Sequence, residues 1–226
     1  MPTHPPIPRQ PNFDRIARPY RVLEHLTLGR ALERCRFHFL SELRAKSPRH
    51  VLALGDGDGR FLARLLNENP QARADAVDTS LAMLTLLRNR CAANSVPANR
   101  LRLHNTSALT FAATPTLPEY DLVVTHFFLD CLTQPELDRL AAQLAPRLSL
   151  NAFWLVSDFR IPPAPLAWPA KLFVQLLYLA FRVLTGMRVS SLPDHHAALT
   201  RAGLVRTSQQ LSCAGLLTTE LWSRSS

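Results

Sequence analysis

Three glycines at alternating positions are the strongest chemical signal in the chain. Gly55, Gly57 and Gly59 lie in the run VLALGDGDGR at residues 51–60, where a short apolar segment gives way to a segment with helical spacing. A glycine has no Cβ, so a ligand can approach its backbone closely, and the amides at the start of a helix point toward such a ligand. The spacing therefore predicts a turn that binds a nucleotide-like molecule.

An acidic residue further along the chain supports this interpretation. Asp78 ends the next apolar segment, about 20 residues after Gly59, and a carboxylate there can accept both ribose hydroxyls of an adenosine. Several classes of nucleotide-binding turn share the G-x-G-x-G spacing, so the glycines alone leave the ligand open. The purely structural alternative is a tight turn followed by a surface aspartate.

The segments that must position these residues alternate between strand and helix patterns. Residues 13–46 have apolar side chains at helical spacing, interrupted by Pro19 and Gly29. The predicted strands cover residues 50–55, 74–78, 101–105, the start of 120–130, 152–159, and approximately 204–211 and 215–223. Helices are expected at residues 61–69, 80–94, 135–148 and 195–203. This alternation implies right-handed crossovers and a mostly parallel sheet, with the ligand at the carboxyl ends of the strands.

Length and composition indicate one globular domain. The 226 residues are 47% hydrophobic and 19% charged. Five prolines within residues 1–12 predict a disordered leader, which leaves residues 13–226 as a single domain. The predicted parts of that domain are N-terminal helices at 13–46, a cofactor-binding core at 49–160, an apolar helical insert at 161–190, and a C-terminal helix with a strand hairpin at 191–226.

The charge and the cysteines restrict the class of protein. The net charge is +9, but the basic residues are scattered and all except Lys46 and Lys171 are arginine, which favours a solvated arginine-rich surface over a dedicated anionic partner. Cys35, Cys91 and Cys131 lie far from one another and from Cys213, with no C-x-x-C motif. We therefore expect reduced thiols in a cytoplasmic protein, without a zinc site, a disulfide framework or a secretory leader.

The chain resembles the class I S-adenosylmethionine-dependent methyltransferases in four runs: VLALGDGDGRFLARLL, AVDTSLAML, HNTSAL and YDLVVTHFFLDCL. The resemblance covers residues 13–160 and is closest to small-molecule enzymes of the ubiquinone and menaquinone biosynthesis type. It implies an α/β Rossmann-like fold with a mostly parallel seven-stranded sheet in the order 3214576 and an antiparallel last strand. Helices are expected on both faces, together with an N-terminal helical lid.

The resemblance also implies a site for S-adenosylmethionine. Gly55, Gly57, Gly59 and the backbone near Asp56 would face the methionine portion of the cofactor, and Asp78 would hold the ribose.

Further positions that match the family's motifs complete the implied site. Thr79 and Met83 would lie beside the adenosine, and Asn105 and Thr106 would border the adenine edge. Two residues after the fourth strand segment, Thr125 and His126, would close the site below the sulfonium. Tyr20, in the segment that resembles the lid helix, could cover the cofactor or simply pack against a neighbouring helix.

The chain departs from the family pattern at two positions. Ala53 stands where the family has an acidic residue in the first strand, so the ammonium group of the ligand needs another partner, with Asp56 and Asp58 as candidates. Asn105 replaces the usual aspartate after the third strand, which removes a charge but keeps an acceptor for the adenine amino group.

Three residues are candidates for a general base. Methyl transfer from a sulfonium depends mainly on positioning, and a base is needed only if the acceptor must lose a proton. His126, Asp130 and Asp158 follow strand segments on the expected ligand side. The structural alternatives are a wall residue for His126, a helix cap for Asp130, and pairing with Arg160 for Asp158.

An apolar stretch at residues 166–184 bears on the substrate. Its core, LFVQLLYLAFRVL, is interrupted by Gln175 and Arg182 and is too short to span a bilayer. It could wall a lipophilic pocket, rest on anionic lipid through Lys171, Arg182 and Arg188, or be an ordinary core helix.

The sequence thus predicts an enzyme that transfers a methyl group from S-adenosylmethionine to a small, lipophilic acceptor. The alternatives are a nucleic-acid methyltransferase and a noncatalytic S-adenosylmethionine-binding protein. A nicotinamide-dependent oxidoreductase fits less well, because Arg60 breaks the G-x-G-x-x-G pattern and no Tyr-x-x-x-Lys pair occurs. We expect no specific nucleic acid, because the basic residues are scattered. We also expect no metal site, since the adjacent His195 and His196 of a helix would point in different directions. A peripheral contact of residues 166–188 with the inner membrane surface is compatible with the sequence, and the oligomeric state is left open.

Overall fold

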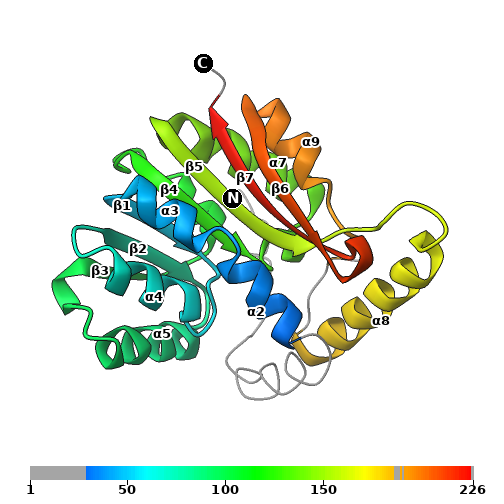
Figure 1. The fold of residues 1–226 in the computed structure, drawn as a ribbon, viewed down its shortest axis with the longest axis horizontal. Helices are drawn as coiled ribbons and strands as arrows, with labels where there is room; N and C mark the ends of the chain where they lie inside the picture. The colour runs from blue at the N-terminus through cyan, green and yellow to red at the C-terminus, as the bar shows by residue number, and fades with distance from the viewer. Residues whose placement is uncertain (1–28, 186–188, 190, 225–226) are drawn as a thin grey trace, which may run out of the picture.

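The centre of the protein is a seven-stranded sheet, seen in a computed structural model that describes residues 29–185, 189 and 191–224. The strands are β1 (His50–Leu54), β2 (Arg73–Asp78), β3 (Leu101–Asn105), β4 (Tyr120–His126), β5 (Leu148–Phe159), β6 (Leu204–Ser212) and β7 (Leu217–Arg224). Their order is β3-β2-β1-β4-β5-β7-β6 (Figure 1). Pairing is parallel from β3 to β5, and β7 is antiparallel to both β5 and β6. The predicted fold class and strand order are confirmed.

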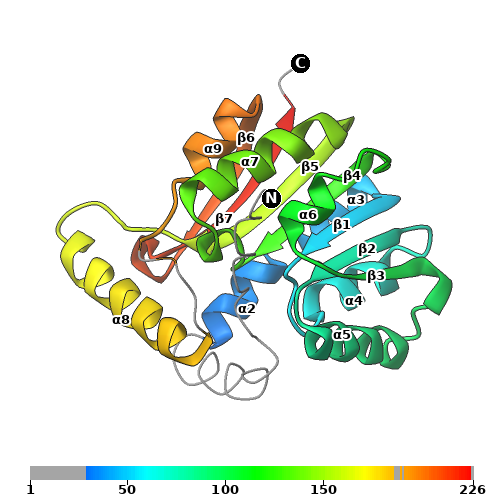
Figure 2. The ribbon, with the colours of Figure 1, turned by 180° about the vertical axis from the view of Figure 1, so that it is seen from behind.

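Helices cover both faces of this sheet. On one face lie α3 (Leu40–Lys46), α4 (Arg60–Glu68) and α5 (Leu81–Ala93), which we call the α4 face. On the other lie α6 (Ala108–Ala112), α7 (Gln134–Leu144) and α9 (His195–Arg201), which we call the α7 face (Figure 2). Because successive side chains of a strand point to opposite faces, each central strand contributes to both cores.

The crossover from β1 through α4 to β2 positions the glycine turn. Val51 and the three residues after it in β1 are buried, and Phe61, Leu62 and Leu65 of α4 are fully buried against the sheet. Both segments are therefore anchored by apolar packing, while the turn between them is left at the carboxyl edge of the sheet. On α5, Met83, Leu84 and Leu87 are buried.

The N-terminal helical region is broken once within the described part. Helix α2 (Gly29–Phe37) and helix α3 are separated at residues 38–39, and α3 ends at Ser47, whose φ of 49° cannot continue a helix. Two predictions, the disordered leader at 1–12 and the placement of Tyr20, lie outside the described residues.

Helix α8 (Ala167–Thr185) lies beyond the turn that joins β6 to the start of β7, beside α2 (Figure 1). Its inner side chains Val174 and Tyr178 are buried, and Phe173 and Leu177 pack against a small cluster that includes Leu32 of α2. Its outer side exposes four large apolar side chains, Trp168, Leu172, Leu176 and Leu179. An ordinary core helix is therefore excluded for the segment. None of the described helices is long and apolar enough to cross a membrane.

Candidate active site

The glycine turn has the backbone geometry that the sequence predicts. Gly55, Gly57 and Gly59 have φ angles of 63°, 59° and 75°, in the left-handed region that favours glycine. The Gly55 amide donates to the carbonyl of Val77 at 3.0 Å, which ties the turn to β2. A Cβ on Gly55 would lie 2.4 Å from Cδ2 of Phe128, whereas a Cβ on Gly57 would meet no atom within 4 Å. Gly57 is therefore the glycine whose missing side chain leaves open space.

Two acidic residues within the turn differ in their partners. Asp58 forms ion pairs with Arg60 at 3.2 Å and with Arg90 at 2.8 Å. Asp56 accepts a hydrogen bond from the Leu62 amide at 3.2 Å, and burial raises its pKa to about 7. The charge of Arg36 only partly offsets this burial, so a ligand's ammonium group would further stabilise the charged form of Asp56. Of the two candidates that could replace the family's acid at Ala53, Asp56 is the better placed.

The ends of β2 and β3 bring Asp78 and Asn105 side by side. These residues are register partners, and the Asn105 amide nitrogen donates to the carbonyls of Asp78 at 3.1 Å and Thr79 at 3.0 Å. The Asp78 carboxylate accepts from the Ser80 amide at 2.8 Å. Since both Asn105 amide hydrogens are directed at the β2 end, its Oδ1 is the atom left to accept from a ligand. Met83 is buried, and Thr79 and Thr106 are half-buried beside this edge.

Thr125 and His126 at the end of β4 point to opposite faces of the sheet. The Thr125 hydroxyl is buried on the α7 face, where it accepts from the Trp154 indole at 3.0 Å. His126 packs edge-on against Phe61 on the α4 face, with its Nδ1 2.9 Å from the Ser157 hydroxyl. Burial holds the pKa of His126 well below its usual value, so the ring is neutral, and its buried Nε2 has no partner among the described residues.

Asp130 and Asp158 form a buried pair beneath the end of the sheet. Asp130 lies in the short 3-10 helix η2 (Leu129–Cys131), and its amide donates to Asp158 Oδ2 at 3.1 Å. Burial raises the pKa of Asp130 to about 6, and burial together with the Asp130 charge raises the pKa of Asp158 well above its usual value. Tyr178 of α8 donates to the Asp130 carbonyl at 3.2 Å. The charge of Asp130 therefore disfavours ionisation of Asp158.

The structural alternatives for these aspartates are wrong. Helix α7 is capped by Thr133 and Glu136, whose carboxylate accepts from the Thr133 amide at 2.9 Å, so Asp130 is not the cap. Asp158 accepts from the Phe159 amide at 2.7 Å and forms no ion pair with Arg160. The three candidate bases also do not form one cluster, because His126 faces the α4 side of the sheet and the aspartates do not.

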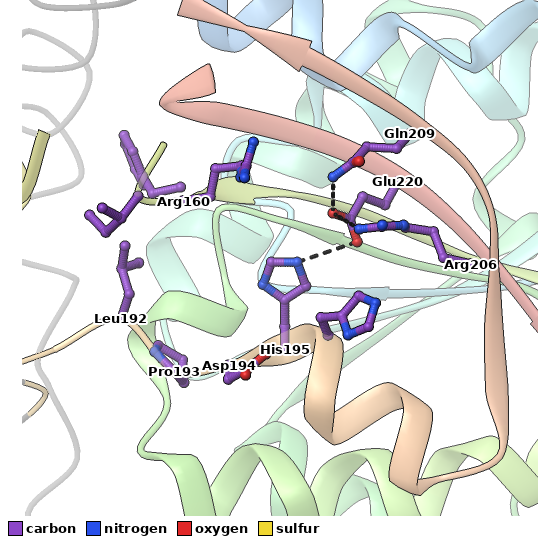
Figure 3. Close-up of a pocket in the computed structure, with 11 residues that line it drawn as sticks. Arg160, Leu192, Pro193, Asp194, His195, Arg206, Gln209 and Glu220 are labelled. Atoms are coloured by element: carbon purple, nitrogen blue, oxygen red, sulfur yellow. Dashed lines mark hydrogen bonds and ion pairs between the residues drawn. The ribbon is translucent and has the colours of Figure 1, made fainter. Parts of the chain in front are cut away.

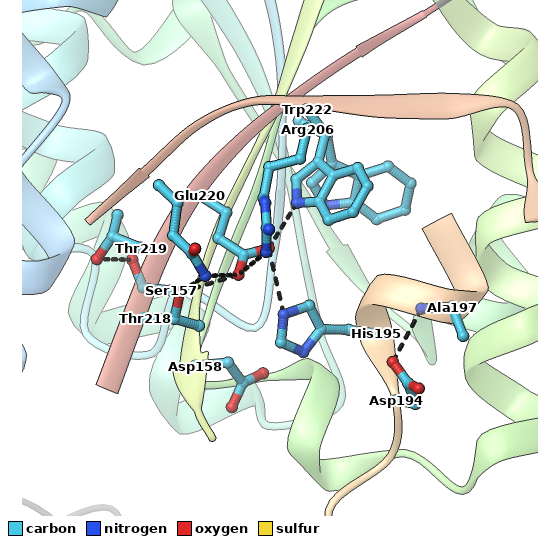
Figure 4. Close-up of polar contacts among 12 residues, drawn as sticks. Ser157, Asp158, Asp194, His195, Ala197, Arg206, Thr218, Thr219, Glu220 and Trp222 are labelled. Atoms are coloured by element: carbon cyan, nitrogen blue, oxygen red, sulfur yellow. Dashed lines mark hydrogen bonds and ion pairs between the residues drawn. The ribbon is translucent and has the colours of Figure 1, made fainter. Parts of the chain in front are cut away.

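Sequence reasoning missed a second polar cluster around Glu220. This carboxylate, 2% exposed on β7, is surrounded by donors from β6, β7 and α9 (Figure 4). The donors are Arg206 at 3.2 Å, Gln209 at 2.9 Å, Thr218 at 2.9 Å, the Trp222 indole at 2.9 Å and His195 Nε2 at 3.4 Å. A single glutamate inside an otherwise uncharged predicted strand was the one available signal. The described residues contain no group of His, Cys, Asp and Glu that could hold a metal ion.

The core of the chain is similar to a known protein family. Residues 52–153 match the model of a family described as a methyltransferase domain. No curated protein sequence matches the chain.

Solved structures share the fold at low identity. The mitomycin 7-O-methyltransferase MmcR is 20% identical with a TM-score of 0.61, over 83% of this chain and 54% of that chain. CalO1, a methyltransferase of calicheamicin biosynthesis in its SAH-bound form, is 18% identical with a TM-score of 0.58, over 79% and 50%. The N-methyltransferase NodS from Bradyrhizobium japonicum WM9 is 14% identical with a TM-score of 0.60, over 87% and 98%.

The chain aligns with only part of several of these structures. The chain spans about half to two thirds of the length of the O-methyltransferase structures with which it aligns. What these structures share with the chain is the sheet and its covering helices. Residues 52–153 thus match a methyltransferase domain, and the chain shares its fold with these methyltransferase structures.

Proposed function

We propose that the protein transfers a methyl group from S-adenosylmethionine to a small, lipophilic acceptor. The observation that carries this proposal is the left-handed glycine turn facing Asp78 and Asn105 at the ends of three adjacent parallel strands. The family match and the SAH-bound relative support the choice of cofactor, and the relatives named for mitomycin and calicheamicin biosynthesis support a small-molecule acceptor.

The residues of the turn and of the strand ends would each hold one part of the cofactor. Gly57 would let the backbone approach the methionine portion, with Gly55 and Gly59 shaping the turn. Asp56 would pair with its ammonium group, and Asp78 would accept the ribose hydroxyls. Asn105 Oδ1 would accept from the adenine amino group, beside Thr106.

The remaining residues would line the site, and the only unpartnered buried polar atom that the described residues among them offer is Nε2 of His126. Thr79 and Met83 lie beside the adenosine position, and Thr125 and His126 form the floor at β4. The Thr125 hydroxyl and the His126 Nδ1 are already bonded within the sheet layers. Tyr20 remains a proposal for the cover of the site.

The chemistry of transfer is an in-line displacement supplied by the cofactor's sulfonium methyl, and the protein contributes orientation and exclusion of water. The Asp130 and Asp158 pair lies next to the wall formed by Phe128, which itself packs against Gly55. Both carboxyl groups have raised pKa values, so either is a candidate to take a proton from an acceptor hydroxyl.

Isothermal titration with S-adenosylhomocysteine tests the cofactor site. We expect binding by the wild-type protein, and a loss of roughly tenfold to a hundredfold in affinity for Asp78→Asn, because a charge-assisted bond to the ribose is replaced by a neutral one. Asp138→Asn, which alters an exposed carboxylate on α7, should bind as wild type does. Failure of the folded wild-type protein to bind either S-adenosylhomocysteine or S-adenosylmethionine would refute the proposal.

We further propose that the protein is cytoplasmic and contacts an anionic membrane surface through α8. The exposed side chains Trp168, Leu172, Leu176 and Leu179 repeat every three or four residues along one side of the helix, the pattern of an interfacial amphipathic helix. Residues 160–193 contain four basic and no acidic residues, in a chain of net charge +9. Two copies of so basic a surface would repel one another, whereas an anionic lipid surface would attract it.

Vesicle flotation tests this contact. Vesicles containing phosphatidylglycerol should bind the wild-type protein, and Leu172→Ser with Leu176→Ser should weaken binding by roughly tenfold or more, since each substitution removes one large apolar group. Leu150→Ser is the matched control, because Leu150 is 84% exposed on β5 away from α8. Equal binding of all variants, or dimerisation that the α8 substitutions abolish, would contradict membrane contact.

A further inference from the structure

A pocket of about 550 Å³ opens beside the Glu220 cluster, between the end of β5, the segment before α9, and strands β6 and β7 (Figure 3). Its apolar wall consists of Phe159, Ile161, Leu192 and Pro193. Its polar wall consists of Arg160, Asp194, His195, His196, Arg206, Gln209 and Glu220. A cavity with one apolar side and a few converging polar groups is the usual form of a small-molecule site.

Glu220 fixes the polar wall of this pocket. A carboxylate has about four lone-pair positions, and five donors converge on Glu220, so it has no acceptor capacity left for a ligand. Its bonds instead hold His195, Arg206 and Gln209 in place. Compared with well-packed apolar residues of similar size, a buried charge network of this kind adds little to stability, which indicates a positioning role.

His195 turns its second ring nitrogen toward the pocket. Nε2 lies 3.4 Å from Glu220 Oε2, and Figure 3 shows Nδ1 on the side of the ring away from Glu220. Nδ1 has no hydrogen-bond partner among the described residues. In neutral histidine, a proton held on Nε2 by the carboxylate leaves Nδ1 as the proton-accepting nitrogen. The same logic orients the base in carboxylate–histidine pairs of known enzymes.

Arg160 provides a cation at the same pocket. Its amide donates to the Leu216 carbonyl at 2.8 Å, and its guanidinium lies near Gly215, with Nη1 3.6 Å from where a Cβ would stand. No ion pair or side-chain hydrogen bond of Arg160 occurs within the described part of the chain. An arginine without a protein carboxylate, at the mouth of a pocket, is suited to pairing with a carboxylate of a ligand.

The pocket adjoins the proposed cofactor site. Phe128 packs against Gly55, and two residues later Asp130 bonds to Asp158 and is electrostatically influenced by His195. Figure 4 shows the Asp158 carboxylate pointing toward His195. Ile161 and Leu192 of the apolar wall pack against the cluster formed by Val174 and Tyr178 of α8. A molecule in the pocket would therefore lie between the cofactor site and the α8 helix.

We infer that this pocket takes the methyl acceptor, that the acceptor is a hydroxylated organic acid, and that His195 removes the hydroxyl proton while Arg160 pairs with the acid group. The inference rests on the proposed function. The acceptor oxygen forms a bond to the methyl carbon, and the carbon–sulfur bond breaks with its electron pair left on sulfur. The hydroxyl proton passes to His195 Nδ1 and then to water. Glu220 is a positioning residue, because it acts through His195.

A coloured probe tests the inference without requiring turnover. The probe is 4-hydroxy-3-nitrobenzoate, whose phenolate absorbs visible light and whose carboxylate would meet Arg160. In the presence of S-adenosylhomocysteine, we expect the wild-type protein to bind it and to lower the apparent pKa of its phenol by about one unit, because His195 accepts the proton. The groups that face His195 and share in this titration are Glu220 of β7, Arg206 of β6, Asp130 of η2 and Asp158 of β5.

Two variants separate the roles of the wall residues. His195→Gln should keep the probe bound but abolish the shift in its phenol pKa. Arg160→Gln, at a half-buried position outside the packed core, should weaken binding roughly tenfold. His196→Gln is the matched control, because His196 is exposed and its ring packs edge-on against Trp222, and it should change the phenol pKa little.

The outcomes distinguish the two proposals. If S-adenosylhomocysteine binds but the probe does not, or if His195→Gln leaves the phenol pKa shift unchanged, the pocket inference is overturned and the proposed function stands. If S-adenosylhomocysteine does not bind, the proposed function fails and the assignment of an acceptor to this pocket fails with it.

Discussion

The two halves of the sheet hold their polar side chains in different ways. In the half formed by β3, β2 and β1, the polar groups of the proposed cofactor site stand at strand ends and bond to backbone, as Asp78 does with Ser80 and Asp56 with Leu62. In the half formed by β5, β7 and β6, Asp158 and Glu220 are almost fully buried and bond to residues on other elements. We call the first set, Asp56, Asp78 and Asn105 with the glycine turn, the cradle. We call the second set, Asp130, Asp158 and Glu220 with their donors, the network. Its bonds can form only after the strands of the sheet have paired.

This difference suits the cradle to ligand binding and the network to proton transfer. The groups of the cradle remain at the surface, where a ligand can complete their bonds. The network has carboxyl groups whose pKa values move in opposite directions, up for Asp130 and Asp158 and down for Glu220, within one region. Environments that shift the pKa values of neighbouring carboxyl groups in opposite directions are typical of sites that transfer protons. Five predictions test whether the two halves differ in this way.

The largest effect is expected at Glu220. Glu220→Gln should lower the free energy of unfolding by about 3–5 kcal/mol, because it leaves Arg206 without its carboxylate and directs an amide group at donors such as the Trp222 indole. Urea unfolding at pH 7 measures the loss. The control is Asp138→Asn on α7, whose exposed pair with Arg201 should contribute less than about 1 kcal/mol. Equal losses in the two variants would show that the network has no special weight.

The effect of Glu220 should depend on pH with a definite sign. Burial alone would raise the pKa of Glu220, but the hydrogen bonds from His195 and Thr218 and the charge of Arg206 outweigh it and lower the pKa to about 2. A group whose pKa is lower in the folded state stabilises the fold above its unfolded value and loses that contribution as pH falls. The gap between wild type and Glu220→Gln should therefore narrow between about pH 4.5 and pH 2.

In the cradle, two glycines of one turn should respond differently. Gly59→Ala should destabilise the fold by about 2–4 kcal/mol, because its Cβ would lie 2.6 Å from Leu87 Cγ and its φ is 75°. In Gly57→Ala, the added Cβ would meet no atom within 4 Å, so the free energy of unfolding should fall by only about 1 kcal/mol, from the φ angle alone. The same substitution should weaken the binding of S-adenosylhomocysteine by roughly tenfold or more, because the Cβ would fill the space left open for the ligand. Thermal unfolding and titration calorimetry together measure both. A Gly57→Ala variant with undiminished affinity would remove Gly57 from the site.

The same contrast explains what could be predicted from the sequence. The strand order, the glycine turn and the pairing of Asp78 with Asn105 follow from short motifs, because each depends on residues that are close in the chain or at the ends of adjacent strands. Even so, β5 begins at Leu148, four residues before the predicted start, since its first residues pair with β4 around an irregularity at Tyr120.

The Glu220 network could not have been predicted in this way. His195, Arg206 and Glu220 converge because β7 returns antiparallel between β5 and β6, and no spacing rule gives the register of that hairpin. The two adjacent histidines were considered only as metal ligands, and the partner of His195 is a carboxylate on β7. Likewise, the left-handed φ of 53° at Phe127 ends the alternation of β4, which places Asp130 beneath the sheet edge where a helix cap was considered.

A gain in stability is expected from Asp130→Asn. Burial raises the pKa of Asp130 to about 6, so the unfolded chain releases its proton at lower pH than the folded protein does. Such a group destabilises the fold increasingly from its ordinary value up to its folded value. The asparagine, which carries no charge and can still accept from the Cys131 thiol, should be about 2 kcal/mol more stable than wild type above pH 6 and no more stable near pH 4. A constant difference across this range would contradict the assignment.

The smallest effects should be the same in both halves, because helix caps depend on neighbouring residues alone. Ser80 caps α5 in the cradle by accepting from the Met83 amide at 3.2 Å, and Glu136 accepts from the Thr133 amide at the start of α7. Ser80→Ala and Glu136→Ala should each lower the free energy of unfolding by about 1 kcal/mol, measured by urea unfolding at pH 7. If the two losses differ by more than about 1 kcal/mol, even these local contacts depend on the network. The contrast between the two halves would then have a cause other than the separation of the bonded residues along the chain.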